Sequence, residues 1–181
     1  MIIMCNTLLM SNSPSARHAS VAFLLAQVGA SAAREFAKAL IPLNFTPPDA
    51  GILRLLGRSP GISQQELAKR LDMHASRLVA VIDELEKRGF VARETNPSDR
   101  RVYSLRLTQA GNEALAAIGV VARAHNETIC TGLDNNERLQ LGALLGKIAA
   151  QQGLTQGVHP GYKDIHMRGD ATPGTETQPP E

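Results

Sequence analysis

The sequence has no tryptophan, and aromatic residues make up only 3% of its 181 residues. A protein that binds single-stranded nucleic acid by stacking bases on aromatic side chains is therefore not expected. Its two cysteines, Cys5 and Cys130, are too few for a disulfide scaffold or a four-cysteine zinc site, and they fit a reducing cytoplasm. Apolar runs stay shorter than the roughly 18–20 residues that cross a bilayer, so no membrane association is expected.

An excess of positive charge is also missing. The chain carries 19 Lys and Arg against 17 Asp and Glu, a formal net charge of +2, which is too low for a protein that coats nucleic acid by bulk basicity. Between Arg58 and Arg106, however, ten basic residues stand against seven acidic ones. This local excess of three charges means that any basic surface is confined to the middle of the chain.

Motifs of the common enzyme classes are absent as well. The sequence contains no glycine-rich phosphate loop, no Gly-x-Ser-x-Gly and no His-Glu-x-x-His. The histidines do not have the spacing of a helical metal-ligand pair. We therefore expect neither enzymatic activity nor a metal or other cofactor.

Composition divides the chain into a central domain and two ends. Residues 153–181 are rich in proline, glycine and threonine and poor in apolar residues. Such a segment buries too little surface to offset its ordering entropy, so it is predicted to be a disordered tail. Residues 1–16 are predicted to be a disordered leader, which leaves one domain over residues 17–152.

Within this domain, apolar residues at spacings of three and four predict amphipathic helices. Thr46, Ser63, Thr108 and Asp134 stand where N-caps are expected, and Ser63 and Asp134 each have a glutamate three residues later, as in a capping box. The predicted helices cover approximately residues 17–40, 47–57, 63–71, 74–88, 109–130 and 135–151.

One stretch, residues 90–107, interrupts the helices. Residues 90–94 and 101–107 are strand-like, and the polar cluster 95–100 between them predicts a turn. A short helix, a tight turn, a second helix and then a hairpin form a winged helix-turn-helix. The predicted fold is therefore mainly α with a small β-hairpin wing. A DNA-binding unit over about residues 46–108 is flanked by helices at about 17–41 and 109–151.

The second helix of this unit has one face suited to DNA. Leu78, Val81, Ile82 and Leu85 point inward at helical spacing, which places Ser76, Ala80, Asp83 and Lys87 on the opposite side. Because the N-terminal half of such a helix reaches base edges, its candidate contacts come from the first two turns. These residues are His74, Ala75, Ser76, Arg77 and Ala80.

Each candidate has a chemical role. Arg77 suits a bidentate contact to guanine, Ser76 a base or phosphate, and Ala80 a thymine methyl group. Asp83 and Glu84 would repel phosphates, so we expect the helix to tilt out of the groove there. The free amides that follow Ser63, together with Gln64, predict a phosphate contact at the start of the preceding helix.

The predicted wing has a more specific signature. Residues 96–101, Asn-Pro-Ser-Asp-Arg-Arg, are followed by Leu107-Thr108-Gln109-Ala110-Gly111. The pattern Asp-x-Arg and then Leu-Thr-x-x-Gly resembles that of the MarR (multiple antibiotic resistance regulator) family of transcription factors, and the resemblance extends over about residues 17–151. It implies that Arg101 enters the minor groove and that Asp99 orients it, which agrees with the negative potential of a narrow minor groove. Arg100 is expected to face a phosphate.

The resemblance also implies a partner and an effector. The N- and C-terminal helices carry apolar residues that need a partner, among them Leu24, Val28 and Leu144, and relatives dimerise through these helices. A two-fold dimer predicts a pseudo-palindromic double-stranded operator with half-sites about one helical turn apart. Relatives commonly respond to phenolic ligands or to oxidants. The expected function is thus a cytoplasmic, dimeric repressor released from DNA by a small-molecule effector.

The sequence assigns no effector site and allows two alternatives to this function. The residues that would bind an effector are unknown, because the candidates Phe36, Leu40, Phe45 and Leu56 suit a hydrophobic core better. One alternative is a winged helix that docks another protein rather than DNA. Another is a thiol-based redox regulator, although neither Cys5 nor Cys130 lies in the first helix, where the sensing cysteine of the family lies.

Overall fold

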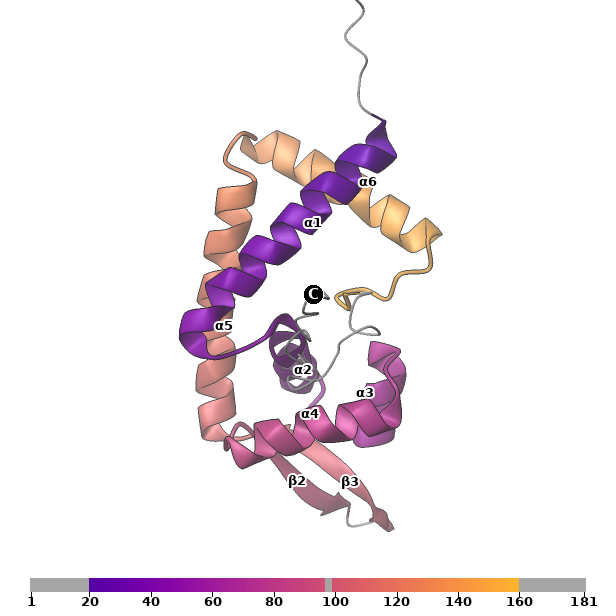
Figure 1. Ribbon diagram of the computed structural model, residues 1–181. Helices are drawn as coiled ribbons and strands as arrows, with labels where there is room; N and C mark the ends of the chain where they lie inside the picture. The colour runs from indigo at the N-terminus through magenta and orange to yellow at the C-terminus, as the bar shows by residue number, and fades with distance from the viewer. Residues whose placement is uncertain (1–19, 97–98, 160–181) are drawn as a thin grey trace, which may run out of the picture.

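The computed structural model describes residues 20–96 and 99–159, which form helices and one small sheet (Figure 1). The predicted fold class, mainly α with a hairpin wing, is confirmed. The elements are α1 (Val21–Leu40), a 3-10 turn η1 (Ile41–Leu43), α2 (Pro47–Arg58), β1 (Ile62–Ser63), α3 (Gln64–Leu71), α4 (Ala75–Lys87), β2 (Val91–Asn96), β3 (Asp99–Leu107), α5 (Gln109–Ile129) and α6 (Asn135–Gln151).

The elements form two groups at opposite ends of the molecule. In Figure 1, α1 and α6 cross at one end, whereas α3, α4 and the β2–β3 hairpin lie at the other. The long helix α5 extends from the sheet to the corner where α6 begins, and α2 lies between the two groups and contacts α5. The structure thus separates a helix-turn-helix unit, which carries the wing, from a second group of helices, α1, α5 and α6, which we name the helical frame.

Local capping signals explain why the helices begin where they do. Thr46 and Asp49 form a reciprocal capping box, with hydrogen bonds of 3.3 and 2.8 Å, and Asp134 and Glu137 form another. Of the two hydrogen bonds in the capping box predicted at Ser63, only one forms. Ser63 Oγ accepts the Glu66 amide at 3.1 Å, but the Glu66 carboxylate accepts a hydrogen bond from Arg70 at 3.0 Å. Salt-bridge formation one turn along the helix therefore replaces the second capping bond.

The sheet differs from the prediction in two ways. It has three antiparallel strands in the order β1-β3-β2, because Ile62 and Ser63 pair with Leu105 and Ser104. A two-residue strand carries no alternation of its own, so only the register with β3 reveals it. The hairpin is also longer than expected, since β2 reaches Asn96 and β3 begins at Asp99. The polar cluster 95–100 is therefore mostly strand, and the predicted turn there is wrong in its extent.

A single hydrophobic core joins α2, α3, α4 and the sheet, and reaches the last turn of α1. Its fully buried members include Leu53, Leu67, Leu78, Ile82 and Leu105, each with no exposed surface. Phe45 and Phe90 contact each other at this core's edge, with ring centroids 5.0 Å apart. The Arg88 guanidinium lies over both rings, at 4.7 and 5.0 Å, which adds cation–π attraction to their packing.

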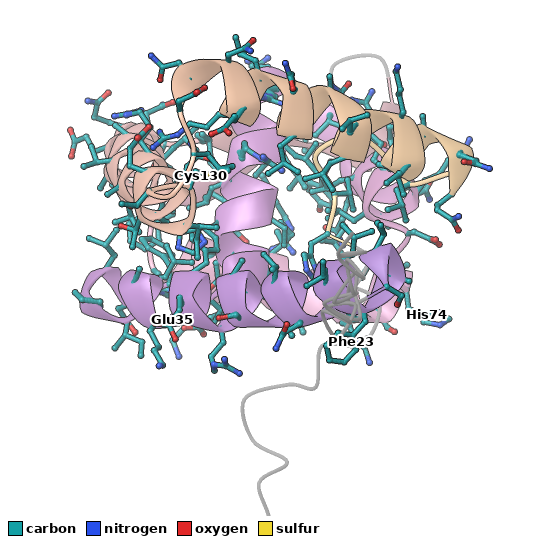
Figure 2. All side chains as sticks on the ribbon, turned by 90° about the horizontal axis from the view of Figure 1, so that it is seen from above. Phe23, Glu35, His74 and Cys130 are labelled. Atoms are coloured by element: carbon teal, nitrogen blue, oxygen red, sulfur yellow. The ribbon has the colours of Figure 1, made fainter. Side chains whose placement is uncertain are left out.

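The frame helices leave their apolar faces exposed. Phe23 of α1 is 60% exposed and projects outward in Figure 2, and Leu139 of α6 is 75% exposed. No residue of α6 is buried. A run of large apolar side chains this exposed is typical of a surface that another molecule covers.

After α6 the chain turns back towards the hydrophobic core. Residues 153–159, which we expected within a disordered tail, form two turns that bring Val158 against the hydrophobic core. The leader 1–16 and the remainder of the tail, residues 160–181, lie outside the described residues. Across the described ranges, no helix is long and apolar enough to span a membrane.

Candidate nucleic-acid interface

The helix-turn-helix is built around a tight turn at Asp72 and Met73. Asp72 adopts the left-handed conformation, with φ of 50°, which Asp tolerates better than most residues. The Met73 amide donates to the Ala68 carbonyl at 3.0 Å, and the Met73 side chain is buried. These contacts fix the angle between α3 and α4.

The orientation of α4 agrees with its helical pattern. Leu78, Ile82 and Leu85 are fully buried, whereas Ser76 is exposed on the opposite side. Ala80 is half-buried at the edge of the exposed face. Arg77 is also half-buried, in the first turn of the helix. The polar face thus includes Ser76 and borders on Arg77, as the periodicity predicts.

The N-cap residue of α4 does not cap the helix with its side chain. His74 is the N-cap residue, but its side chain makes no capping hydrogen bond and projects from the edge of the molecule in Figure 2. Ala75 beside it is exposed. First-turn amides at the positive end of a helix dipole that receive no bond from the N-cap side chain suit a phosphate.

The wing lies at the same end of the molecule as α4 (Figure 1). The backbone of Asp99, Arg100 and Arg101 forms the first part of β3, next to the tip. The side chains of these three residues lie outside the described part of the structure. Their position in the chain therefore places them near the tip, and their predicted roles stay predictions.

Arg93 of β2 connects the wing to both helices of the helix-turn-helix. Its guanidinium donates to the carboxylates of Asp83 and Glu86 in α4, and to the Gln64 amide oxygen of α3 at 3.5 Å. The Glu86 carboxylate also accepts the Arg93 backbone amide at 3.3 Å. Only 18% of the Arg93 side chain is exposed. One cation therefore connects the wing, α4 and α3.

This cluster changes the electrostatics of α4. Partial burial alone would lower the pKa of Arg93, but the hydrogen bonds to Asp83 and Glu86 raise it above its ordinary value. The guanidinium is thus permanently charged and offsets the carboxylate of Asp83. The repulsion from phosphates expected of Asp83 is weakened within the protein itself, whereas Glu84 stays exposed.

The residues at the start of α3 play two parts. Ser63 lies in β1 and also caps α3 through its hydroxyl group. The Gln64 amide oxygen accepts from Arg93, which turns its NH2 group away from the guanidinium. An NH2 donor beside the first-turn amides of α3 is compatible with the predicted phosphate contact.

Replacing Arg93 with Met should leave Asp83 and Glu86 without their shared cation. We expect the free energy of unfolding to fall by about 1–3 kcal/mol, the usual cost of losing hydrogen bonds to charged groups. Any affinity for DNA should fall too, because Asp83 then faces phosphates uncompensated. Adding Asp83→Asn should restore part of that affinity. Urea titrations and DNA-binding isotherms measure the two effects.

The matched control is Arg106→Met. Arg106 also pairs with a glutamate, Glu94, at 2.7 Å, but both side chains are at least half exposed. Exposed pairs contribute about 0–1 kcal/mol. If Arg93→Met destabilises the protein no more than Arg106→Met does, the Arg93 cluster has no special role.

Sequence reasoning missed Arg93, although a signal was present. Strand alternation places Arg93 on the same side as Val91, and the register sets it opposite buried Leu105. A charged residue at an inward position needs partners. The acidic residues Asp83 and Glu86 of α4 are these partners. The inward position of Arg93 becomes evident only from the register of β2 against β3.

The remaining candidates have clear positions. Leu40, Phe45 and Leu56 are buried in the core and Phe36 packs against it, which supports their reading as core residues. Cys130 is the half-buried C-cap of α5 and lies where α5 meets α6 (Figure 2). Cys5 lies outside the described residues.

Comparison with known proteins agrees with this architecture. The family model described as "MarR family" matches residues 45–103. A protein of Thauera aromatica assigned to regulate transcription of the hcr operon is 34% identical over 126 residues, which are 69% of this chain and 76% of that protein. The transcriptional repressor Rv2887 of Mycobacterium tuberculosis is 31% identical over 132 residues, 73% of this chain and 95% of the repressor.

Similar structures solved with DNA include two that are at least 30% identical to this chain. The repressor CouR bound to a 23-mer duplex superposes with a TM-score of 0.66 at 31% identity, over 72% of this chain and 92% of that chain. The Rv2887 complex gives 0.63 at 30% identity, over 72% and 98%. MarR-family proteins are transcription regulators and not enzymes, as the missing enzyme motifs predict. The chain belongs to the MarR family of winged helix-turn-helix regulators.

Proposed function

We propose that this protein is a sequence-specific, double-stranded DNA-binding transcriptional repressor that acts as a homodimer in the cytoplasm. One observation carries the proposal: the exposed face of α4 and the wing lie together at one end, while the exposed apolar helices lie at the other. The first end suits a DNA groove and the second suits a partner subunit. The relatives named as repressors, two of them solved with DNA, support the same function.

The exposed frame supports the homodimer. Val21, Leu24 and Val28 of α1 and Leu144 of α6 are all more than two-fifths exposed in a single chain. A second copy, related to the first by a two-fold axis, would cover these faces. The two α4 helices, as recognition helices, would then read the two half-sites of a pseudo-palindrome. Sedimentation equilibrium at micromolar concentration should give a dimer. A monomer would refute this part of the proposal.

The DNA contacts that we propose fall into three groups. His74, Ala75, Ser76, Arg77 and Ala80 of the recognition helix approach base edges, with Arg77 as the guanine reader. Ser63 and Gln64 approach a phosphate from the start of α3. In the wing, Arg101 enters the minor groove, Asp99 orients it and Arg100 faces a phosphate.

Release from the operator by a small, phenolic ligand completes the proposal. An effector weakens DNA binding only if it has higher affinity for a spacing of the two recognition helices that does not fit the operator. The family membership of the chain supports this step. Its test is an operator-binding assay repeated with a panel of phenolic acids, together with peroxide as the arm that detects a redox response.

Operator selection from random duplexes followed by fluorescence anisotropy tests the function as a whole. For DNA binding, the logarithm of the association constant should fall linearly with the logarithm of salt concentration, by about 0.9 for each neutralised phosphate. A module that docks proteins would select no sequence and would show no such slope. Failure to select a DNA sequence, or the absence of this salt dependence, would overturn the proposal.

Replacing Arg77 with Ala should relax the preference at one base pair in each half-site. Loss of a bidentate contact to guanine costs about 1–3 kcal/mol at that position and little elsewhere. Selection repeated with the variant shows which positions change. A uniform loss of affinity for every sequence would instead identify Arg77 as a phosphate contact.

A further inference from the structure

The chain continues past α6 into a segment that returns to the centre of the molecule, residues 153–159, which we name the C-terminal strap (Figure 1). Its first turn reverses the chain. Gly153 adopts φ of 66°, and the amides of Gly153 and Leu154 donate to the carbonyls of Ala150 and Ala149 at 3.1 and 3.0 Å. A left-handed glycine with these two bonds is typical of a C-cap that redirects the chain.

The strap docks on α2. The Arg54 guanidinium donates a hydrogen bond to the Gly157 carbonyl. A side chain at Gly157 would meet Arg54 Nη2 at 3.2 Å and Arg58 Nη1 at 3.8 Å, so two arginines one helical turn apart enclose this glycine. Val158 then packs half-buried against the hydrophobic core. The contact thus combines an apolar anchor with a hydrogen bond from a charged donor.

The contact matters because α6 has little other attachment to its own chain. No residue of α6 is buried. Its N-terminal end is held by the Asp134 capping box and by Arg138, which donates to the Leu133 carbonyl at 3.0 Å and pairs with Glu127. At its C-terminal end the strap supplies the attachment. The helix is therefore fixed at both ends and open along its length.

We propose that the C-terminal strap, by docking on Arg54 and the core through Gly157 and Val158, restrains the C-terminal end of α6 against the DNA-binding unit. Because α2 contacts both α5 and β3, this restraint connects the frame to the sheet that carries the wing. If α6 forms the dimer interface, the strap also limits the spacing of the two recognition helices. That consequence, unlike the restraint itself, rests on the proposed DNA-binding function.

Substitutions in the full-length chain test the restraint. Val158→Asp removes the apolar anchor, and Arg54→Met removes the hydrogen bond from α2. The matched control is Gln156→Asp, which adds the same charge at an exposed position of the same segment. Native-state amide hydrogen exchange should be at least about tenfold faster in Val158→Asp and Arg54→Met at Gly153, Leu154 and Val158, and in the last turn of α6. The control should exchange like the wild type.

Operator affinity supplies a second, separate readout. We expect a roughly threefold to tenfold loss in Val158→Asp, since a freer frame lowers the population of the binding-competent spacing. Unchanged amide exchange in both strap variants would overturn the restraint. Faster exchange with unchanged operator affinity would overturn its connection to DNA binding. If the wild-type chain selects no operator, the proposed function fails, and hydrogen exchange alone decides the restraint.

Discussion

Gly111→Ala is expected to destabilise the protein by about 3 kcal/mol or more. A Cβ atom at this position would lie 2.0 Å from the carbonyl oxygen of Phe90 and 3.0 Å from its carbonyl carbon. Both are backbone atoms, so the first turn of α5 and the base of the wing must move apart. Overpacking in a tight site usually costs about 1–3 kcal/mol, and a clash with backbone belongs at the top of that range. Thermal and urea unfolding measure the loss.

The control for this prediction lies in the same helix. At Gly119 an added Cβ would meet only the tip of the Arg123 side chain, at 3.4 Å, and that tip is free to move. Since Ala favours a helix over Gly by about 0.5–1 kcal/mol, Gly119→Ala should be neutral or stabilising. If both variants unfold alike, the close approach at Gly111 does not exist in solution.

The same geometry explains the Leu-Thr-x-x-Gly pattern that this chain shares with the MarR family. In Leu107-Thr108-Gln109-Ala110-Gly111, Thr108 caps α5 by accepting the Gly111 amide at 3.0 Å, and its hydroxyl group donates to the Gly89 carbonyl at 2.6 Å. The Thr108 amide donates to the Phe90 carbonyl at 3.1 Å. Threonine and glycine three residues apart therefore attach the end of α4 and the start of β2 to α5.

Local chemistry predicted the helices because their signals are short in sequence. Thr46 with Asp49, and Asp134 with Glu137, each satisfy backbone amides within one turn, so the capping bonds need no distant partner. The inward stripe of α4 is equally local, because 100° per residue defines it. The polar face of the recognition helix was predictable for the same reason.

The features that escaped prediction depend on contacts between distant segments. Ile62 becomes a strand residue only because Leu105 lies beside it, 43 positions further along the chain. Arg93 has its hydrogen-bond partners, Asp83 and Gln64, in two other elements. The strap binds through Val158 and Arg54, more than a hundred residues apart in sequence. In each case composition and periodicity describe the segment and do not identify its partner.

Arg101→Ala should cause the largest loss of specific DNA binding. An arginine in a narrow minor groove gains from the enhanced negative potential there, and its removal should cost about 1–3 kcal/mol at each half-site. A dimer would present two such residues, and their free-energy costs add. The factor by which operator affinity falls should therefore be about the square of the factor for one half-site. Fluorescence anisotropy with the selected operator, and with a scrambled duplex of the same length, measures specific and non-specific binding.

Arg100→Ala is the control that separates a groove contact from a loss of charge. The two arginines are adjacent in β3 and carry the same charge, so both variants should reduce the salt dependence by a similar amount, about one unit of slope for each lost contact. Only Arg101→Ala should remove the preference for operator over scrambled DNA. Equal losses on both duplexes in both variants would make Arg101 a phosphate contact, and the specificity would then rest on α4 alone. Asp99→Asn should reproduce part of the Arg101→Ala effect, because a neutral amide holds a guanidinium less firmly than a carboxylate does.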